Sequence, residues 1–333
     1  MSFFPHPILA IETSCDETSA AIVEETAIRS NIVASQIDLH RKWGGVVPEA
    51  AARAHVESIL PVIEEALETA HLSVDEVRAV AVTNRPGLIG ALSVGVTAAK
   101  ALAYAKGIPL LGIHHLEGHL LSPLSIHPDL PFPHTCLIVS GGHTELVEVR
   151  ALGEYRIVGQ TRDDAAGEAF DKGARLLGLG YPGGRAIQEA AQAGNPHRYP
   201  LPKGLSGDTT DFSFSGLKTA MLRLVQSEGS QISIPDAAAS LQATIVSVLA
   251  ERAIRACEQL NSKALSLVGG VAANLALRER LQIACDQSGI KFLTPPIELC
   301  TDNAAMIGLA ASYRLARGEP DGFDLDCIAS EEL

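Results

Sequence analysis

The chain has 333 residues, of which 47% are hydrophobic, and its formal net charge is -13. This length is sufficient for two domains of about 150 residues each. The acidic charge argues against a chain that binds nucleic acid unaided, because such binding depends mainly on Lys and Arg neutralising phosphates. The sequence shows no secretory signal and no run of about 18 uncharged apolar residues, so we expect a soluble, cytoplasmic protein without a membrane span.

Apolar, β-branched runs alternate with helical stretches, which predicts an α/β fold in which helices cover the sheets. In chain order, the predicted elements are a strand at 8–11, a helix at 51–70, a strand at 79–83, a helix at 90–106, strands at 110–113, 136–139 and 146–149, helices at 186–193 and 234–260, a strand at 264–268 and a helix at 273–288. Pro and Gly are frequent between 181 and 207, which predicts a loop and a possible insertion.

A weak internal repeat relates the two halves of the chain. A shift of 128 positions aligns residues 9–14 with residues 137–142, and each run precedes polar residues and a second apolar stretch. Both segments predict strand-turn-strand hairpins. Small and hydroxyl residues at such tips let backbone amides approach a phosphate, so two facing hairpins could hold a nucleotide in a cleft between lobes. Two ordinary hairpins with tight turns would give the same pattern.

Three histidines, His114, His115 and His119, share one short segment, and Asp302 lies far downstream. His115 and His119 are four residues apart, so on a helix both imidazoles would project from one face and could bind one ion. Two imidazoles and a carboxylate suit a divalent transition metal such as iron or zinc, with open positions for substrate. An ordinary solvated helix face shows the same histidine spacing.

A glycine-rich turn around Gly269 and Gly270 follows an apolar strand and opens a helix, where backbone amides favour anions. Asn274 in this turn either contacts a ligand or caps the helix. The six cysteines show no short paired spacing, so we expect reduced thiols.

Several ordered segments, spread from about residue 8 to residue 317, resemble the bacterial TsaD family. They are residues 11–19 (IETSCDETS), 44–49, 86–88, 114–119 (HHLEGH), 139–144 (VSGGHT), 163–172, 181–184, 211–218, 269–274 and 300–303. The chain departs from the family at Arg85, where many relatives carry glycine. The first six residues and the tail after Gly318 carry no motif, and both are candidates for poor order.

The resemblance implies an ASKHA fold, the duplicated two-lobe architecture of actin, sugar kinases and Hsp70, with an interlobe cleft. Residues 1–133 would form the N-terminal lobe, to which the C-terminal helix is a candidate addition. Residues 134–333 would form the C-terminal lobe, with an inserted helical and loop region around 160–225. The implied enzyme is a tRNA N6-adenosine threonylcarbamoyltransferase, an acyltransferase. It moves the threonylcarbamoyl group from L-threonylcarbamoyladenylate to the adenosine adjacent to the anticodon of ANN-decoding tRNAs and releases AMP.

The resemblance also implies cofactors and partners. One divalent metal is expected per subunit, with Fe²⁺ favoured and Zn²⁺ possible. The expected partners are TsaB, a paralogue that forms a heterodimer, and TsaE, an ATPase. The tRNA is the substrate, and a TsaC-type enzyme supplies the adenylate.

The family's functional residues fall on specific positions of this sequence. The implied metal ligands are His115, His119 and Asp302, and the implied substrate-binding residues are Ile138, Val139, Ser140, Gly141, Gly142, Asp171, Gly184 and Asn274. Asp171 could instead form an ion pair with Lys172 or Arg175.

Asp16 and Glu12, on the first predicted hairpin, are the candidate catalytic residues. Either carboxylate could position the attacking amine or accept its proton. The alternative for both is hydrogen bonding within the hairpin turn.

Other functions also fit parts of the sequence. A zinc metalloprotease needs glutamate directly after its first histidine, whereas Leu116 stands there and Glu117 comes one position late. A phosphotransferase of the same fold has no evident need for His115 and His119. A non-catalytic, nucleotide-dependent scaffold that binds TsaB is the fourth possibility.

Overall fold

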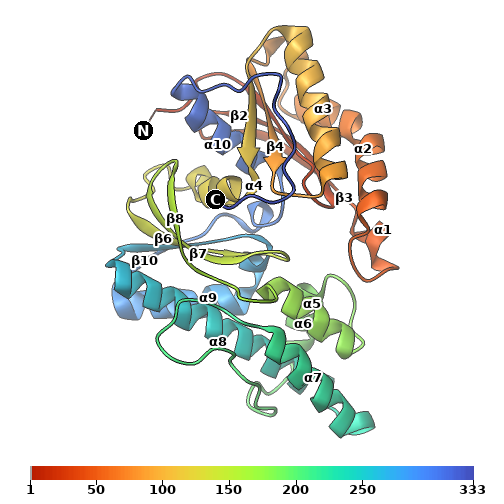
Figure 1. Ribbon diagram of the computed structural model, residues 1–333, viewed down its shortest axis with the longest axis vertical. Coiled ribbons are helices and arrows are strands. Elements are labelled where there is room, and N and C mark those ends of the chain that lie inside the picture. Colours follow the sequence, from red (N-terminus) through yellow and green to blue (C-terminus); the bar gives the residue numbers. More distant parts are fainter. Residues whose placement is uncertain (1) are drawn as a thin grey trace. The chain divides into compact units, whose positions relative to one another are not determined.

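The computed structural model describes residues 2–333 and divides the chain into two compact units. The first unit contains the residues up to Leu130 together with Thr301–Leu333, and the second contains Pro131–Cys300. Each unit has a five-stranded mixed sheet covered by helices (Figure 1), which confirms the predicted α/β class. The C-terminal segment therefore belongs to the same unit as the N-terminal residues.

The sheet of the first unit has the strand order β3-β2-β1-β4-β5. The strands are β1 (Ile8–Glu12), β2 (Glu17–Glu24), β3 (Ala27–Ser35), β4 (Ala79–Arg85) and β5 (Leu110–His114). Strand β1 pairs antiparallel with β2 and parallel with β4, and β4 pairs parallel with β5. All residues of β1 and β5 are buried, as expected of strands with both faces covered.

Helices cover both faces of this sheet. Its helical elements are α1 (Ile37–Arg41), α2 (Pro48–Thr69), η1 (Val74–Glu76), α3 (Ile89–Lys106), α4 (His115–Leu121), η2 (Ser122–Ser125) and α10 (Ala304–Ala316). Leu9 and Ile11 of β1 share one hydrophobic core with α2 and α3. Ala10 points the other way, where a Cβ at Gly308 of α10 would lie 3.3 Å from its side chain. Strand alternation thus places α10 on the opposite face.

The sheet of the second unit repeats this topology. Its strands are β6 (His134–Val139), β7 (Thr144–Ala151), β8 (Glu154–Gln160), β9 (Ala264–Val268) and β10 (Lys291–Leu293). Their order is β10-β9-β6-β7-β8, with β6 antiparallel to β7 and parallel to β9. Strands β6 to β10 therefore correspond to β1 to β5, which confirms the two hairpins predicted from the repeat.

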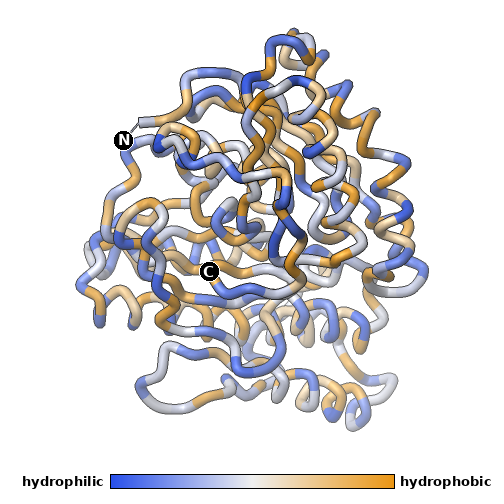
Figure 2. The backbone as a smooth tube through the Cα atoms, turned by 45° about the horizontal axis from the view of Figure 1, so that its top comes forward, coloured by the Kyte–Doolittle hydropathy of each residue, from blue (hydrophilic) through white to orange (hydrophobic). Residues whose placement is uncertain are grey.

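Helix α8 is the longest helix of the second unit. The helical elements there are α5 (Ala166–Leu176), α6 (Gly183–Ala191), α7 (Ser215–Glu228), η3 (Gly229–Gln231), α8 (Ile234–Leu260), η4 (Gly270–Ala273), α9 (Leu275–Ser288) and η5 (Ile297–Leu299). By length and composition α8 could cross a membrane, but 67% of its apolar window is buried in the protein, as in a core helix. Hydrophobic and hydrophilic stretches alternate along much of the backbone (Figure 2), as expected where helices cover a sheet with one face.

Helix α6 confirms the helix predicted at 186–193, and residues 192–207 form the expected loop. Two other predictions need correction. Within residues 2–6, Phe4 is held by two main-chain hydrogen bonds: its N donates to Ser312 O at 3.0 Å, and its O accepts from Glu25 N at 3.1 Å. The tail after Gly318 is also fixed, because Asp321 N donates to Leu110 O at 2.8 Å. The hydrogen bonds to main-chain groups of the first unit hold both ends, a tertiary effect that composition does not show.

Candidate metal centre and substrate-binding residues

Helix α4 presents two histidines on one face. His114 ends β5, and its Nδ1 accepts a hydrogen bond from Leu116 N at 3.2 Å, which caps the helix. Burial lowers the pKa of His114 to about 4, so this ring is neutral at pH 7. The rings of His115 and His119 then lie one turn apart, with centroids 4.8 Å from each other. The predicted helical arrangement of this pair is confirmed.

Asp302 comes to the same place from the other end of the chain. It stands just before α10, where Asn303 caps the helix by accepting from Met306 N at 3.1 Å. Helix α10 packs closely on α4, because a Cβ at Gly118 would lie only 2.8 Å from Ile307 Cδ1. Close packing of the two helices brings Asp302 to the histidines, although 183 positions separate it from His119.

The geometry of the three side chains fits a transition metal ion. Asp302 Oδ1 lies 3.2 Å from His119 Nε2 and 3.4 Å from His115 Nε2, and one ligand atom from each residue lies within 4.8 Å of the others. Two ligands that are each about 2.1 Å from an ion are separated by about 3.0–3.4 Å at octahedral to tetrahedral angles. The two distances from Asp302 Oδ1 fall in this range. The donor set is the two-histidine, one-carboxylate type.

Glu12 lies fully buried behind His115. Its Oε2 is 3.2 Å from His115 Nδ1 and also accepts from Thr83 Oγ1, while its Oε1 accepts from Ser14 N at 2.5 Å. The carboxylate thus turns Nδ1 of His115 toward itself and Nε2 toward Asp302, as outer-shell partners of metal-bound histidines do. Ser14 and Thr83 were not identified from the sequence, and their only signal is their position at the ends of neighbouring strands.

The charges of this group stabilise one another. Burial works to lower the pKa of His115, but Asp302 and Glu12 outweigh it and raise that pKa well above its usual value. Burial works to raise the pKa of Asp302, but His115 and His119 hold it well below its usual range. The pKa of Glu12 is likewise lowered by His115 despite its burial. Burial lowers the pKa of His119, so this ring is neutral, as a metal ligand must be.

Asp16 occupies the turn between β1 and β2 and is half-buried. Burial raises the pKa of its carboxyl group, against a hydrogen bond with Cys15 that lowers it. His55 of α2 braces this turn, with Nδ1 2.7 Å from Thr18 Oγ1 and Nε2 3.0 Å from Cys15 O. Burial raises the pKa of the Cys15 thiol as well, so the thiol form is favoured and Cys15 is not an activated nucleophile.

The predicted substrate-binding residues all lie in the second unit. Ile138 and Val139 are buried at the end of β6, and Ser140–Gly142 form the turn into β7. Ser140 fixes this turn, because its N donates to His143 O at 2.8 Å and its Oγ accepts from His143 N at 3.0 Å. Gly141 and Gly142 are exposed, and a Cβ at either position would meet nothing within 4 Å.

Asp171 of α5 contacts the beginning of α6. Its Oδ1 accepts from Gly183 N at 2.7 Å. Lys172, one of its two suggested ion-pair partners, instead contacts Asp164 at 2.8 Å and Glu168 at 2.7 Å. The next residue of α6, Gly184, has open space where a Cβ would be.

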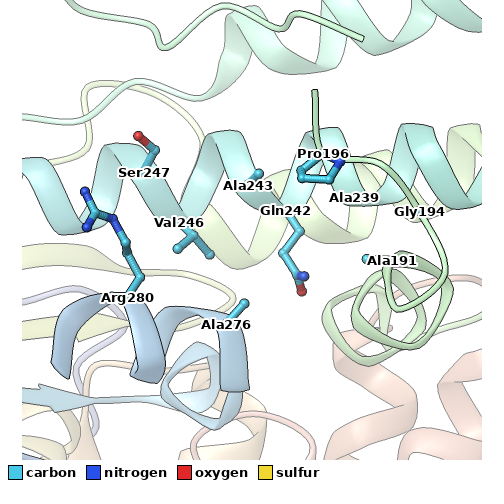
Figure 3. A pocket seen from close by; sticks show the side chains of 10 residues that line it. All are labelled: Ala191, Gly194, Pro196, Ala239, Gln242, Ala243, Val246, Ser247, Ala276 and Arg280. Atoms are coloured by element: carbon cyan, nitrogen blue, oxygen red, sulfur yellow. The ribbon is translucent and has the colours of Figure 1, made fainter. Parts of the chain in front are cut away.

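Asn274 caps α9, as the alternative to ligand contact predicted. Its Oδ1 accepts from Leu277 N at 3.0 Å, and its Nδ2 donates to Gln242 Oε1 at 2.9 Å. Gln242 also lines a pocket of about 320 Å³ between α8, α9 and the end of α6 (Figure 3). The lining residues are mostly small and apolar: Ala191, Gly194, Pro196, Ala239, Gln242, Ala243, Val246, Ser247, Ala276 and Arg280.

Comparison with known sequences gives one consistent result. Residues 27–309 match the family described as "TsaD: tRNA N6-adenosine threonylcarbamoyltransferase". A protein of that name from Acaryochloris marina is 51% identical over 331 residues, which cover 97% of this chain and 92% of the relative. Another from a Synechococcus species is 54% identical over 329 residues, which cover 96% of this chain and 90% of the relative.

Solved structures with the same fold are much more distant in sequence. A full-length HypF in its phosphate- and nucleotide-bound form is 14% identical, with a TM-score of 0.61 over 96% of this chain and 48% of that chain. Component A of (R)-2-hydroxyglutaryl-CoA dehydratase from Acidaminococcus fermentans is 17% identical, with a TM-score of 0.55 over 93% of this chain and 99% of that chain. Together with the duplicated sheets, these likenesses confirm the ASKHA-type fold.

Proposed function

The chain belongs to the TsaD family of tRNA N6-adenosine threonylcarbamoyltransferases, and we propose that its two units supply separate parts of this reaction. The enzyme transfers the threonylcarbamoyl group of L-threonylcarbamoyladenylate to N6 of the adenosine adjacent to the anticodon in ANN-decoding tRNAs, and AMP is released. The observation that carries the proposal is the cluster of His115, His119 and Asp302 in the first unit.

These three residues would hold one divalent metal ion, with Fe²⁺ favoured and Zn²⁺ as the alternative. Bound there, the ion supplies Lewis-acid chemistry that favours negative charge on the carbamoyl oxygen and on the leaving phosphate. We assign Glu12 to orienting His115 through Nδ1. Both oxygens of the Glu12 carboxylate already accept hydrogen bonds, so they are not available to a substrate. Asp16 is the candidate proton acceptor for the attacking amine, because its carboxyl group is half-buried and its pKa is raised by burial.

The second unit would bind the nucleotide part of the adenylate. Gly141, Gly142 and Gly184 support this, because none of them has a neighbour within 4 Å that would exclude a side chain. Packing therefore gives no reason for glycine at these positions, whereas close approach of a ligand to the backbone does. We infer that ribose hydroxyls donate to Asp171 and that Asn274, fixed by its cap, lies along the same nucleotide.

The competing functions are less well supported by the site. Leu116 follows the first histidine, so the residue that would act as the base of a metalloprotease is missing from its place. A phosphotransferase would leave the histidine pair and Asp302 without a role. A non-catalytic scaffold would need neither a charged, buried metal site nor Glu12 oriented behind it.

The charge of the chain supports shared binding of tRNA. With a net charge of -13, the chain would rely on a partner for part of the phosphate contacts. We propose a heterodimer with TsaB, assistance from the ATPase TsaE and supply of the adenylate by a TsaC-type enzyme, all in the cytoplasm. Exposed apolar side chains on α2, Val56 (64% exposed) and Leu60 (61% exposed), offer a surface for a protein partner.

Reconstitution tests the proposal directly. The purified chain is incubated with TsaB, TsaE, a TsaC-type enzyme, tRNA, threonine, bicarbonate and ATP, and the modified adenosine is measured by mass spectrometry. We expect product from the wild type and from His197→Ala, whose side chain is exposed in the second unit. His115→Ala should lose both metal and product while the fold is retained. Absence of product from the wild type, with partners shown to be active, would refute the transferase function.

A further inference from the structure

The C-terminal segment, residues 319–333, lies along the edge of the first unit's sheet (Figure 1). Strand β5 is the last strand of that sheet, so one side of its backbone lacks a strand partner. Asp321 closes this edge, because its N donates to Leu110 O and its Oδ2 accepts from Gly112 N, both at 2.8 Å. Arg314 donates to Gly112 O at 2.7 Å from α10. The edge strand that leads into α4 is thus held from outside the sheet.

The segment then crosses the end of β4. Asn84 Nδ2 donates to Asp326 O at 2.9 Å, and Ile328 N donates to Asn84 O at 3.0 Å. Beyond this point Arg85 forms an ion pair with Glu331. The ion pair ties the end of β4 to the last residues of the chain.

The last residues reach His114, the neighbour of the first metal ligand. His114 Nε2 lies 3.2 Å from Glu331 O. A carbonyl oxygen can only accept, so Nε2 carries the hydrogen and Nδ1 of the neutral ring is the acceptor. Nδ1 is the atom that accepts from Leu116 N and caps α4. The carbonyl of Glu331 therefore stabilises the ring tautomer that caps the helix of His115 and His119.

We propose that the C-terminal segment positions the metal site through Glu331, whose carbonyl fixes the tautomer of His114 and whose carboxylate is anchored by Arg85. Helix α4 has only seven residues, so a single cap affects a large part of its length. The inference rests on the proposed metal site but not on the transfer reaction. Glu331, His114 and Arg85 are positioning residues, since none of them is a ligand.

The test is removal of residues 329–333 from the otherwise complete chain, which keeps the contacts of Asp321 and Ile328. Zn²⁺ affinity is measured by competition with a chromophoric chelator, and the tautomer of His114 by ¹⁵N NMR of the metal-free protein. We expect Zn²⁺ to bind about tenfold more weakly, at the low end of outer-shell effects. The share of the Nε2–H tautomer of His114 should fall, because only the Leu116 amide would still favour it.

Matched variants separate positioning from general stability. Arg85→Ala should weaken Zn²⁺ binding in the same direction, and Arg85→Lys should restore it, whereas Arg29→Ala, which breaks an ion pair on another strand, should have no effect. In His114→Asn, asparagine caps the helix without a tautomer, so truncation should cause no further loss of Zn²⁺ affinity.

Two results would overturn the inference: an unchanged affinity and tautomer after truncation, or an equal loss of affinity in the His114→Asn background. Failure of the full-length chain to bind Zn²⁺ would instead refute the proposed metal site. The NMR measurement on metal-free protein would then still decide whether the segment fixes His114.

Discussion

The carboxylate oxygens of Glu12 have few lone pairs left to accept a hydrogen bond from a substrate. Its Oε2 contacts His115 Nδ1 and Thr83, and its Oε1 accepts from Ser14 N. A carboxylate that is fully buried and bonded on both oxygens is suited to orienting a ligand, whereas a proton acceptor needs access to the substrate. Of the two candidate catalytic residues, Asp16 is therefore the better proton acceptor and Glu12 the better support for the metal.

Replacing Glu12 with glutamine tests this division. The amide is neutral and favours the wrong orientation of His115, so Zn²⁺ affinity should fall about 10–100-fold. Competition with a chelator measures the change. Glu24→Gln is the matched control, because Glu24 lies at the far end of β2 and contacts Arg29. Equal Zn²⁺ affinity in the wild type and Glu12→Gln would show that Glu12 does not support the metal.

Gly184 offers a test of the proposed nucleotide site. Because a Cβ there would meet nothing within 4 Å, Gly184→Ala should change the free energy of unfolding by no more than about 0.5 kcal/mol. The added methyl group should nevertheless weaken AMP binding at least about tenfold, a loss of about 1.4 kcal/mol, by blocking close approach to the backbone. Thermal unfolding and calorimetric titration with AMP measure the two effects.

Gly183, the residue before Gly184, provides a contrasting variant. A Cβ at Gly183 would lie 2.5 Å from Asp171 Cα, so Gly183→Ala should destabilise the protein through overpacking. Normal AMP binding by Gly184→Ala would argue against a nucleotide at this helix start.

Among the elements, α7 depends on a carboxylate from a distant loop. Asp163 accepts from Phe214 N at 2.7 Å and Ser215 N at 3.1 Å at the beginning of the helix. It also accepts from Ser213 Oγ at 2.5 Å and Ser215 Oγ at 2.7 Å. Burial works against the charge, but these hydrogen bonds lower the pKa of Asp163 to about 2.

This shift predicts a pH dependence of stability. A carboxyl group with a lowered pKa in the folded state stabilises the fold above its unfolded pKa, about 3.9, and loses that contribution as the pH falls toward 2. Asp163→Asn should therefore destabilise the second unit at pH 6, and the difference from the wild type should shrink below pH 4. Urea unfolding across this range measures it. Asp208→Asn, at a 99% exposed side chain, should show no such difference.

The elements differ in how far the sequence predicts them. The hairpins β1–β2 and β6–β7 were predicted because their aligned strands and polar tips repeat in the sequence. The C-terminal helix is expected from the family resemblance alone, and the sequence pattern gives no bounds for it. Helix α10 is buried nearly all round, so it lacks the polar face that produces a helical period. Strand β10 has three residues, too few for a pattern.

The site was predicted only in part for a related reason. The spacing of His115 and His119 is local, and helix formation alone brings the rings together. Glu12 and His115 are 103 positions apart, and their contact depends on the parallel pairing of β1, β4 and β5. The cap of Asn274 follows from local rules, whereas its bond to Gln242 depends on the packing of α8 against α9.

At the scale of the molecule, the first unit is built from both ends of the chain. Helix α10 packs on β1 and β2, where a Cβ at Gly308 would lie 2.5 Å from Val23 Cγ2. The same segment supplies Asp302 and the cover of the β5 edge. Residues up to 130 therefore contain two of the three proposed metal ligands but lack the helix that covers one face of their sheet.

Because the first unit is built from both ends of the chain, we can predict which fragments fold and bind metal. Residues 1–130 alone should aggregate or unfold, because one face of the sheet would be exposed to water. Joining them to residues 301–333 through a flexible Gly/Ser linker should restore a cooperative thermal transition and stoichiometric Zn²⁺ binding. The same fusion with Asp302→Ala should fold but lose most of its Zn²⁺ affinity, which separates ligand loss from unfolding. A folded, Zn²⁺-binding fragment 1–130 would contradict the dependence on α10, because Asp302 and its helix would then be dispensable for both the sheet and the site.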